Sequence, residues 1–337
     1  MDIVKNMQRE SSKGPARGLD AATGAKRAVV GRFAPTPSGR MHLGNIYSSL
    51  LAWLSARSRG GRLLLRVEDL DPRTQSGPWT ELLLDDLRWL GLYWDGDPVY
   101  QGERIDIYQA ALNRLRARGL IYPCFCTRAE LHAASAPHAS DGTPVYAGTC
   151  RGLSAAEIAA ENKRRPPAMR LEVPREGDPA GTILFTDRTY GPYREVLARE
   201  CGDFLVRRSD GVFAYQLAVV VDDAEMGITE VVRGRDLLGS VPRQMYLQRL
   251  LGYDSPEYAH VPLLVAPEGR RLSKRDRDLD MEGLRERFGT PERLLGWLAS
   301  RAGLAESEEP VSAEGLADGF SWNRVRARRD DLVISGP

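Results

Sequence analysis

The sequence is poor in cysteine and contains no long apolar segment. Its 337 residues include only 4 cysteines, too few for the disulfide framework of a small secreted protein. The longest apolar run, at 212–221, is far shorter than the roughly 18 residues that cross a bilayer. The first 28 residues lack the apolar core, roughly 7 to 15 residues long, of a secretion signal. We therefore expect a cytoplasmic protein with no membrane span.

The sequence also lacks an excess of charge of either sign. Lys and Arg number 47 and Asp and Glu number 46, so a nucleic-acid partner would need a local basic patch. Lysine is scarce, since only 5 of the 47 cationic residues are lysines. With 42% hydrophobic and 28% charged residues the composition is that of a globular protein. The length predicts about two domains.

Strand and helix patterns alternate along the chain and predict an α/β fold with a parallel sheet. Residues 1–28 have the composition of a disordered tail. An apolar strand at 29–34 leads into a Pro- and Gly-rich turn at 35–39 and then a helix, which is half of a βαβ unit. The next predicted elements are a buried strand at 62–69 and helices at 79–90 and 104–118.

The pattern changes between residues 119 and 195, a stretch that we interpret as an insertion. Cys, Pro and Gly are frequent there, and a capping box from Ser154 to Glu157 predicts one helix. An Asp-Gly turn then predicts a hairpin of two strands across 203–221. Strands at 228–232 and 260–265 and a helix at 242–251 restore the alternating order. The predicted divisions are a first half of the α/β domain at 29–118, the insertion at 119–195, the second half at 196–265 and a last region at 266–337.

Two segments have features of phosphate-binding sites. The turn at 35–39 precedes a helix, whose free N–H groups and dipole attract anions, and His42 and Gly44 lie just beyond it. Far along the chain, Ser273 and Lys274 lie in a basic loop, where lysine can act as a point charge on phosphates. Taken alone, the first segment is better explained as a βα turn with a surface histidine, and the second is equally well explained as a solvated run of charge.

Together the two segments resemble the HIGH and KMSKS motifs of class I aminoacyl-tRNA synthetases. The first match is Pro35 to Asn45 and the second is Arg271 to Arg275. The resemblance implies a Rossmann-type catalytic domain whose two motifs clamp ATP from opposite sides. Further matches, to the glutamate-specific branch, lie at 32–39, 66–71, 219–223 and 231–234. Only 62 of the 337 residues follow Arg275, which is typical of glutamyl-Q tRNA(Asp) synthetases rather than of full-length glutamyl-tRNA synthetases.

This resemblance implies that L-glutamate is activated by ATP and transferred to the queuosine base at the wobble position of tRNA(Asp). The implied partners are ATP with Mg²⁺, L-glutamate and queuosine-containing tRNA(Asp), and a monomer is expected. No side-chain nucleophile is expected, because the glutamate carboxylate itself attacks the α-phosphorus. Three alternatives stay open: a compact glutamyl-tRNA synthetase that acylates the acceptor end, a paralogue that binds without catalysis, and a small-molecule adenylyltransferase.

The resemblance also assigns site residues. A glutamate site needs guanidinium groups to bind the two carboxylates and a carboxylate to bind the ammonium group. Arg32 and Arg233 suit the first role and Glu68 suits the second. The implied glutamate site consists of Arg32, Phe33, Ala34, Pro35, Thr36, Ser38, Glu68, Tyr215 and Arg233. The implied ATP site consists of His42, Gly44, Asn45, Ser273 and Lys274, with His42 and Lys274 as the catalytic residues. Asn45 departs from the HIGH pattern, which ends in a second histidine, and an asparagine cannot be cationic.

Three cysteines, Cys124, Cys126 and Cys150, are one short of the four ligands of a structural zinc. The candidates for the fourth are Tyr146, His132, His138 and the distant Cys201, and from chemistry alone a histidine is the usual choice. The resembled family carries Cys-x-Cys followed by Tyr-x3-Cys, which implies a zinc site of Cys124, Cys126, Tyr146 and Cys150. The alternative is three reduced cysteines, two of them packing a strand. The full expectation is a Rossmann-type parallel sheet with an inserted, zinc-binding, acceptor-type subdomain and a short helical C-terminal region.

Overall fold

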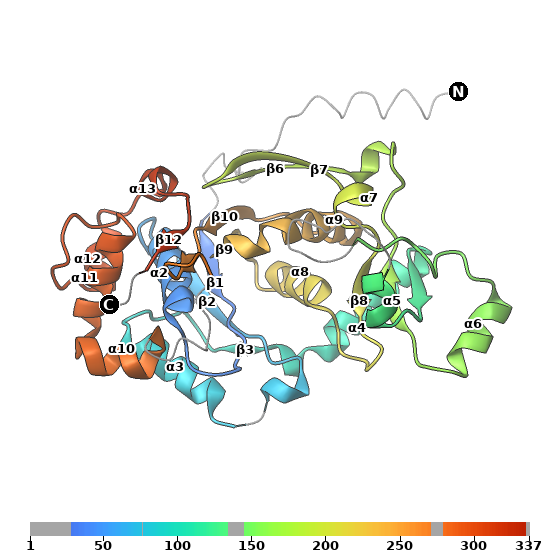
Figure 1. Cartoon of the computed structure of the whole chain (residues 1–337), viewed down its shortest axis with the longest axis horizontal. Helices are drawn as coiled ribbons and strands as arrows, with labels where there is room; N and C mark the ends of the chain where they lie inside the picture. The colour runs from blue at the N-terminus through green and yellow to red at the C-terminus, as the bar shows by residue number, and fades with distance from the viewer. Residues whose placement is uncertain (1–27, 76, 134–144, 271–278, 335–337) are drawn as a thin grey trace.

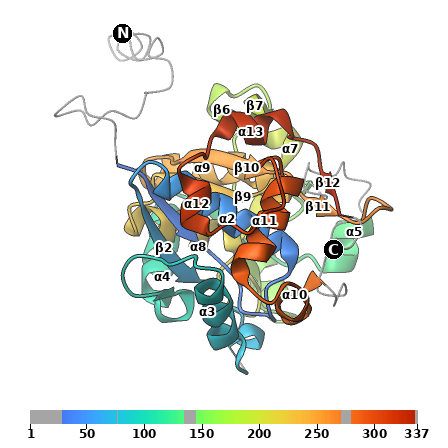
Figure 2. The same cartoon turned by 90° about the vertical axis from the view of Figure 1, so that its left-hand side faces the viewer.

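The computed structural model describes residues 28–75, 77–133, 145–270 and 279–334. The predicted tail and the loop with Ser273 and Lys274 lie outside these ranges. An α/β core occupies the middle of the molecule, with the C-terminal helices at one end and a small antiparallel sheet at the other (Figure 1). The same arrangement seen from one end has the C-terminal helices in front (Figure 2).

The first half of the core is a parallel sheet covered by helices, as the alternating pattern predicts. Its order is β1-β2-β3, and both strand pairs are parallel. Helices α3 and α4 are followed by Gly91 and Gly119, whose φ angles of 71° and 70° suit the left-handed end of a helix. The elements are β1 (Val30–Phe33), α2 (Leu43–Arg57), β2 (Arg62–Val67), α3 (Trp79–Trp89), β3 (Val99–Tyr100) and α4 (Ile105–Ala117).

The second half of the core is a four-stranded sheet of order β7-β6-β10-β9, in which β10 runs parallel to β6 and β9. Strands β6 and β7 form an antiparallel hairpin, the ribbon at the top of Figure 1. The two halves meet where the Thr229 N–H donates to Val30 O at 2.9 Å. The elements are β6 (Thr182–Asp187), β7 (Gly191–Val196), β9 (Glu230–Gly234), α9 (Val241–Leu251) and β10 (Glu257–Val261).

The region between the two halves contains a third sheet, which is antiparallel and has the strand order β4-β5-β8. The predicted capping box is present, since the Ser154 side chain accepts from the Glu157 N–H and the Glu157 side chain accepts in return from Ser154. The elements are β4 (Ile121–Cys124), α5 (Arg128–Ala133), α6 (Ala155–Asn162), β5 (Ala168–Leu171), α7 (Leu197–Glu200) and β8 (Phe204–Arg207).

The predicted hairpin at 203–221 is wrong in its second half. The turn forms, with the Gly211 N–H donating to Arg208 O at 3.1 Å, but only Phe213 bridges back to the first strand. The chain then enters helix α8 (Tyr215–Glu225), in which every residue from 217 to 223 is buried. A helix buried on nearly all sides shows no 3.6-residue periodicity, so its apolar run cannot be told from that of a buried strand.

The C-terminal region is helical, as expected, and several contacts tie it to the core, including a strand pair and a buried hydrogen bond. Strand β12 (Leu332–Val333) pairs in parallel with β11 (Leu264–Val265). The Trp322 indole N–H donates to Ser55 Oγ at 2.9 Å, and Ser55 donates in turn to buried Glu230 at 2.6 Å. The helices of this region are α10 (Met281–Phe288), α11 (Pro291–Arg301), α12 (Ala313–Ala317) and α13 (Trp322–Ala327).

Along the described part of the chain, no helix has both the length and the hydrophobicity that spanning a bilayer requires.

Substitutions at Trp322 should separate its packing from its hydrogen bond. Trp322→Ala removes a buried aromatic side chain and should lower the free energy of unfolding by about 3–5 kcal/mol. Trp322→Phe keeps most of the packing but loses the bond to Ser55, which should cost about 1 kcal/mol. Urea unfolding followed by circular dichroism measures both. Trp79→Ala is the control, since 37% of Trp79 is exposed. Equal losses for the two Trp322 variants would contradict this description.

Candidate active site

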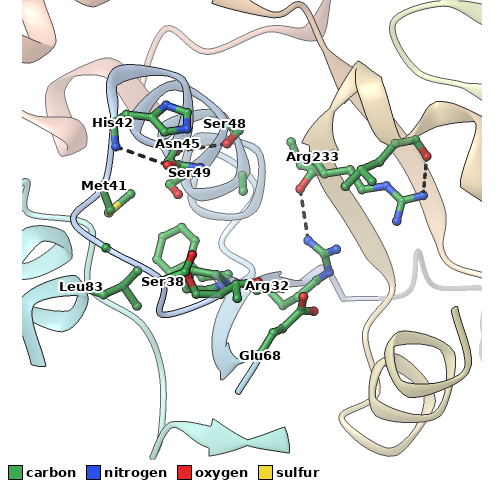
Figure 3. Close-up of a pocket in the computed structure, with 18 of the residues that line it drawn as sticks. Arg32, Ser38, Met41, His42, Asn45, Ser48, Ser49, Glu68, Leu83 and Arg233 are labelled. Atoms are coloured by element: carbon green, nitrogen blue, oxygen red, sulfur yellow. Dashed lines mark hydrogen bonds between the residues drawn. The ribbon is translucent and has the colours of Figure 1, made fainter. Parts of the chain in front are cut away.

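A cavity of about 410 Å³ opens at the carboxyl ends of β1, β2 and β9, beside the start of α2. Arg32 and Glu68 lie at one side of it, Arg233 at a second and His42 with Asn45 at a third (Figure 3). Every residue assigned to glutamate from the sequence lines this cavity, together with His42 and Asn45. Gly44 lines an adjoining cavity of about 180 Å³ that also reaches His42, Asn45 and Arg233. Ser273 and Lys274 lie outside the described residues.

The start of α2 is held by a reciprocal pair of side-chain bonds. His42 is the N-cap, and its Nδ1 accepts from the Gly44 N–H at 3.1 Å. The Asn45 side-chain oxygen accepts from the His42 N–H at 3.3 Å. Since Nδ1 is an acceptor, the proton of the neutral imidazole lies on Nε2. A Cβ on residue 44 would come within 3.1 Å of the imidazole, so glycine keeps the space that His42 occupies.

The floor of the cavity is a buried ion network centred on Arg66, which has no exposed surface. The Arg66 guanidinium lies 2.7 Å from Asp223, 3.2 Å from Glu68 and 3.7 Å from Asp222. Burial opposes this cation, but the three carboxylates together raise the pKa of Arg66 above its ordinary value. Asp222 accepts further hydrogen bonds from Gln101, Arg104 and Tyr108. From the sequence, Asp222 and Asp223 belonged to the segment 219–223 that resembles the glutamate-specific branch, but no role in the site was assigned to them.

Arg32 and Glu68 contact this buried network and also line the cavity, where they present opposite charges. Arg32 donates to Val232 O at 3.1 Å and lies 3.6 Å from Asp223. Burial lowers the pKa of the Arg32 guanidinium despite the attraction of Asp223. Burial also raises the pKa of Glu68, an effect that Arg66 and Arg32 oppose. The cavity therefore presents a fork-shaped cation and a carboxylate side by side, an arrangement suited to a ligand that carries both charges.

Arg233 reaches the cavity from β9 and is held at all three of its nitrogens. Its Nε donates to His260 Nε2 at 3.0 Å, and its two terminal nitrogens donate to the Tyr215 hydroxyl at 3.3 Å and Leu237 O at 3.2 Å. His260 Nδ1 lies 2.7 Å from Asp187 Oδ2. Sequence reasoning did not find Asp187 or His260; the available signal was a histidine within an otherwise apolar strand.

The three predicted cysteine ligands lie together, away from the cavity. The Sγ atoms of Cys124, Cys126 and Cys150 are all within 4.8 Å of one another. The Tyr146 hydroxyl is 3.6 Å from both Cys124 Sγ and Cys126 Sγ, and it accepts from the Cys150 N–H at 2.8 Å. Cys201 lies elsewhere, with its thiol donating to Leu197 O. The side chains of His132 and His138 are outside the described part of the chain.

A buried arginine borders this cluster. Arg170 Nε donates to Cys124 Sγ at 3.2 Å, and its guanidinium carbon lies 3.7 Å from the centre of the Tyr146 ring. Burial alone would raise the pKa of the Cys124 thiol, but hydrogen bonds from Arg170 and Tyr146 outweigh it and lower the pKa. Cys124 therefore favours the thiolate, the form of cysteine that binds metal ions, whereas burial and the neighbouring thiols raise the pKa of Cys126 to about 12.

The buried histidine predicts a specific acid sensitivity of the fold. Burial lowers the pKa of His260 to about 4 from its ordinary value of 6.5; Arg233 and Arg32 oppose its protonation, while Asp187 favours it. Between these two pH values the unfolded chain binds a proton that the folded chain does not, so stability should fall as pH falls from about 6.5 to about 4.

In urea titrations across this window, His260→Gln should reduce the pH slope of the unfolding free energy by up to about 1.4 kcal/mol per pH unit. Parallel slopes for the wild type and the variant would contradict the lowered pKa.

The chain matches known proteins over most of its length. Residues 28–333 match the family model described as "tRNA synthetases class I (E and Q), catalytic domain". The "Glutamyl-Q tRNA(Asp) synthetase" of Symbiobacterium thermophilum is 49% identical over 88% of this chain and 94% of that protein. The protein of the same name from Nitratidesulfovibrio vulgaris is 47% identical over 82% of this chain and 87% of that protein.

A solved structure agrees with the sequence relatives. The glutamate tRNA ligase of Elizabethkingia meningosepticum, in complex with its amino acid, superposes with a TM-score of 0.76 at 28% identity. The alignment covers 92% of this chain and 67% of that one. The expected class I architecture is therefore confirmed, and the chain belongs to the class I tRNA synthetases of the E and Q group.

Proposed function

We propose that this protein is a ligase that activates L-glutamate with ATP and transfers it to queuosine in tRNA(Asp). The observation that carries the proposal is the 49% identity over 94% of the length of a relative named glutamyl-Q tRNA(Asp) synthetase. The likeness to a glutamate tRNA ligase, at 28% identity over 67% of that chain, is weaker. The relatives therefore favour the queuosine acceptor over the alternative of a compact glutamyl-tRNA synthetase.

In the proposed glutamate complex, the two arginines of the cavity bind carboxylates and Glu68 binds the ammonium group. Arg32 and Arg233 are fixed cations on different strands, so they can hold the two ends of a dicarboxylic amino acid. Tyr215 and Ser38 line the same space and supply hydroxyls. A substrate with one ammonium and two carboxylates complements this arrangement.

Activation needs no nucleophile from the protein. A carboxylate oxygen of glutamate attacks the α-phosphorus of ATP, an O–P bond forms, and the bond to pyrophosphate breaks. His42 presents its Nε2–H at the start of α2, where backbone N–H groups also favour phosphate. Lys274 and Ser273 are proposed to contact the leaving phosphates, and Mg²⁺ that accompanies ATP neutralises their charge. A hydroxyl of the queuosine cyclopentenediol then attacks the activated carbonyl, AMP leaves, and an ester forms.

Labelled glutamate tests the proposal directly. The protein is incubated with ATP, labelled glutamate and purified tRNA(Asp) with or without queuosine, with tRNA(Glu) in parallel. Label is expected only on queuosine-containing tRNA(Asp). Label on tRNA(Glu) would instead establish a compact glutamyl-tRNA synthetase. Absence of label from every tRNA would reject both activities.

The relative importance of two ATP-site residues gives a second test. Lys274→Ala removes a proposed phosphate contact and should slow glutamate-dependent ATP–pyrophosphate exchange by roughly 10²–10³-fold. Asn45→His should cost less, because an imidazole nitrogen can still accept the His42 N–H bond. Lys163→Ala, an exposed lysine after α6, is the control. Full exchange activity in Lys274→Ala would overturn the assignment.

We also propose a structural zinc ion on Cys124, Cys126, Cys150 and Tyr146. In a tetrahedral zinc site, two sulfur ligands about 2.3 Å from the metal lie about 3.8 Å apart, and an oxygen ligand at about 2.1 Å lies about 3.6 Å from each sulfur. The Cys126–Cys150 Sγ separation and both Tyr146 hydroxyl to Sγ separations are 3.6 Å, close to these values. Zinc there would cross-link β4 to the segment around Tyr146, in a sheet too small to have a large apolar core of its own.

Metal analysis of purified protein should find one zinc ion per chain. Cys126→Ser should lose the metal, and Tyr146→Phe should retain it more weakly, because each removes one of four ligands. Cys201→Ser should keep a full complement, since this thiol lies away from the cluster. Zinc-free wild type, or equal zinc content in all three variants, would rule out this site.

A further inference from the structure

Arg233 is the last of three buried side chains that are linked in a row and start outside the cavity. Asp187 ends β6, His260 lies on β10 and Arg233 lies on β9, and these strands are neighbours in one sheet. The exposed fractions of Asp187, His260 and Arg233 are 1%, 0% and 6%. The chain thus connects the β6–β7 hairpin to the cavity without contact with solvent.

The first member of the chain is fixed by the backbone. Asp187 Oδ1 accepts from the N–H groups of Thr189 and Tyr190, at 2.9 and 3.0 Å. Asp187 Oδ2 accepts from the His260 N–H at 3.0 Å, and the same oxygen lies 2.7 Å from His260 Nδ1. Three backbone donors therefore hold this carboxylate in place.

The hydrogen bonds determine where the imidazole proton lies. A guanidinium has only donors, so Arg233 Nε at 3.0 Å requires a lone pair on His260 Nε2. The single proton of the neutral ring must then lie on Nδ1, where Asp187 accepts it. Burial keeps the ring neutral by lowering its pKa to about 4. Each donor along the chain faces an acceptor, which fixes the ring and, through it, the plane of the Arg233 fork.

We infer that Asp187 and His260 are positioning residues that orient Arg233 to bind the carboxylate of the substrate glutamate. The inference rests on the proposed function, since it assigns a role within the same site. Within the described residues, three of the five N–H donors of Arg233 are used, on His260, Tyr215 and Leu237. The other two are left for a ligand, and their direction depends on the bond from Nε to His260.

The tautomer can be measured without any substitution. The chain has only 4 histidines, so the imidazole nitrogens of ¹⁵N-labelled protein can be resolved by NMR and assigned with His260→Gln. At pH 7 His260 should be neutral with its proton on Nδ1. A proton on Nε2 would overturn the inference, whatever glutamate affinities the variants show.

Three variants then test the link to glutamate, with its Kd measured by calorimetry. Asp187→Asn is nearly isosteric, but its amide can donate to Nδ1 and move the ring proton to Nε2, where it faces the Arg233 donor. His260→Leu removes the acceptor, and His260→Gln retains one. Asp187→Asn and His260→Leu should raise the glutamate Kd at least about tenfold, while His260→Gln should recover part of the loss. The KM for ATP should stay within about twofold of the wild-type value, since general damage to the site would weaken the binding of both substrates.

Asp203→Asn is the matched control. Asp203 is also buried and accepts from a backbone N–H, that of Val173 at 2.8 Å, but it does not line the cavity. The Asp203→Asn substitution should lower the thermal unfolding temperature about as much as Asp187→Asn does and leave the glutamate Kd unchanged.

The inference would be overturned if folded Asp187 and His260 variants bound glutamate as the wild type does. It would also be overturned if His260→Gln bound glutamate no better than His260→Leu. A wild type that binds no glutamate would reject the proposed function, and this inference with it.

Discussion

The buried guanidinium of Arg66 is the interaction on which the arrangement of the site depends. It has no exposed surface, and a charge in that position is tolerated only when carboxylates surround it. Asp223 on α8 and Glu68 after β2 supply two of them, at 2.7 and 3.2 Å. Helix α8 must therefore dock against β2. Its first residue, Tyr215, is thereby brought to Arg233 on the far side of the cavity.

The same network sets the electrostatics of the cavity. Arg66 pairs with Glu68, Asp222 and Asp223, while Arg32 lies near Asp223 and Arg104 near Asp222. These ion pairs compensate the buried charges, and Arg32, Arg233 and Glu68 also line the cavity, where they present two cations and a carboxylate to a ligand. An amino acid with a second carboxylate complements that pattern without a change in the protein. The specificity proposed for glutamate thus follows from the ion pairs that hold the fold together.

Local sequence signals predicted the part of the site that is built from single segments. The turn at 35–39 and His42 at the start of α2 follow from one strand and its following loop. Resemblance to a known family added Arg32, Glu68, Tyr215 and Arg233, which come from distant segments, and the cavity gathers all of these residues. The fold class also followed from the alternation of buried strands and helices. Lys274 stays a prediction, because it lies outside the described residues.

What the sequence could not predict depends on contacts between distant segments. The stretch before Asp222 was assigned to a strand because a fully buried helix and a buried strand share the same apolar run. Asp187 and His260 are separated by more than seventy residues and meet only because β6 and β10 pair. No local pattern encodes these distant contacts. Asn45 differs from them, since it was interpreted as a departure from a motif although it completes the cap of α2 only three residues from His42.

The most direct test of the account is a crystal structure of the protein with a stable analogue of glutamyl-adenylate. The account predicts the amino-acid part in the cavity, with its ammonium on Glu68, its side-chain carboxylate on one of Arg32 and Arg233, and its phosphate at the start of α2 near His42. The chain from Asp187 through His260 to Arg233 should be unchanged. An analogue bound elsewhere, or with its ammonium away from Glu68, would contradict the central claim that this buried ion network supports a glutamate site.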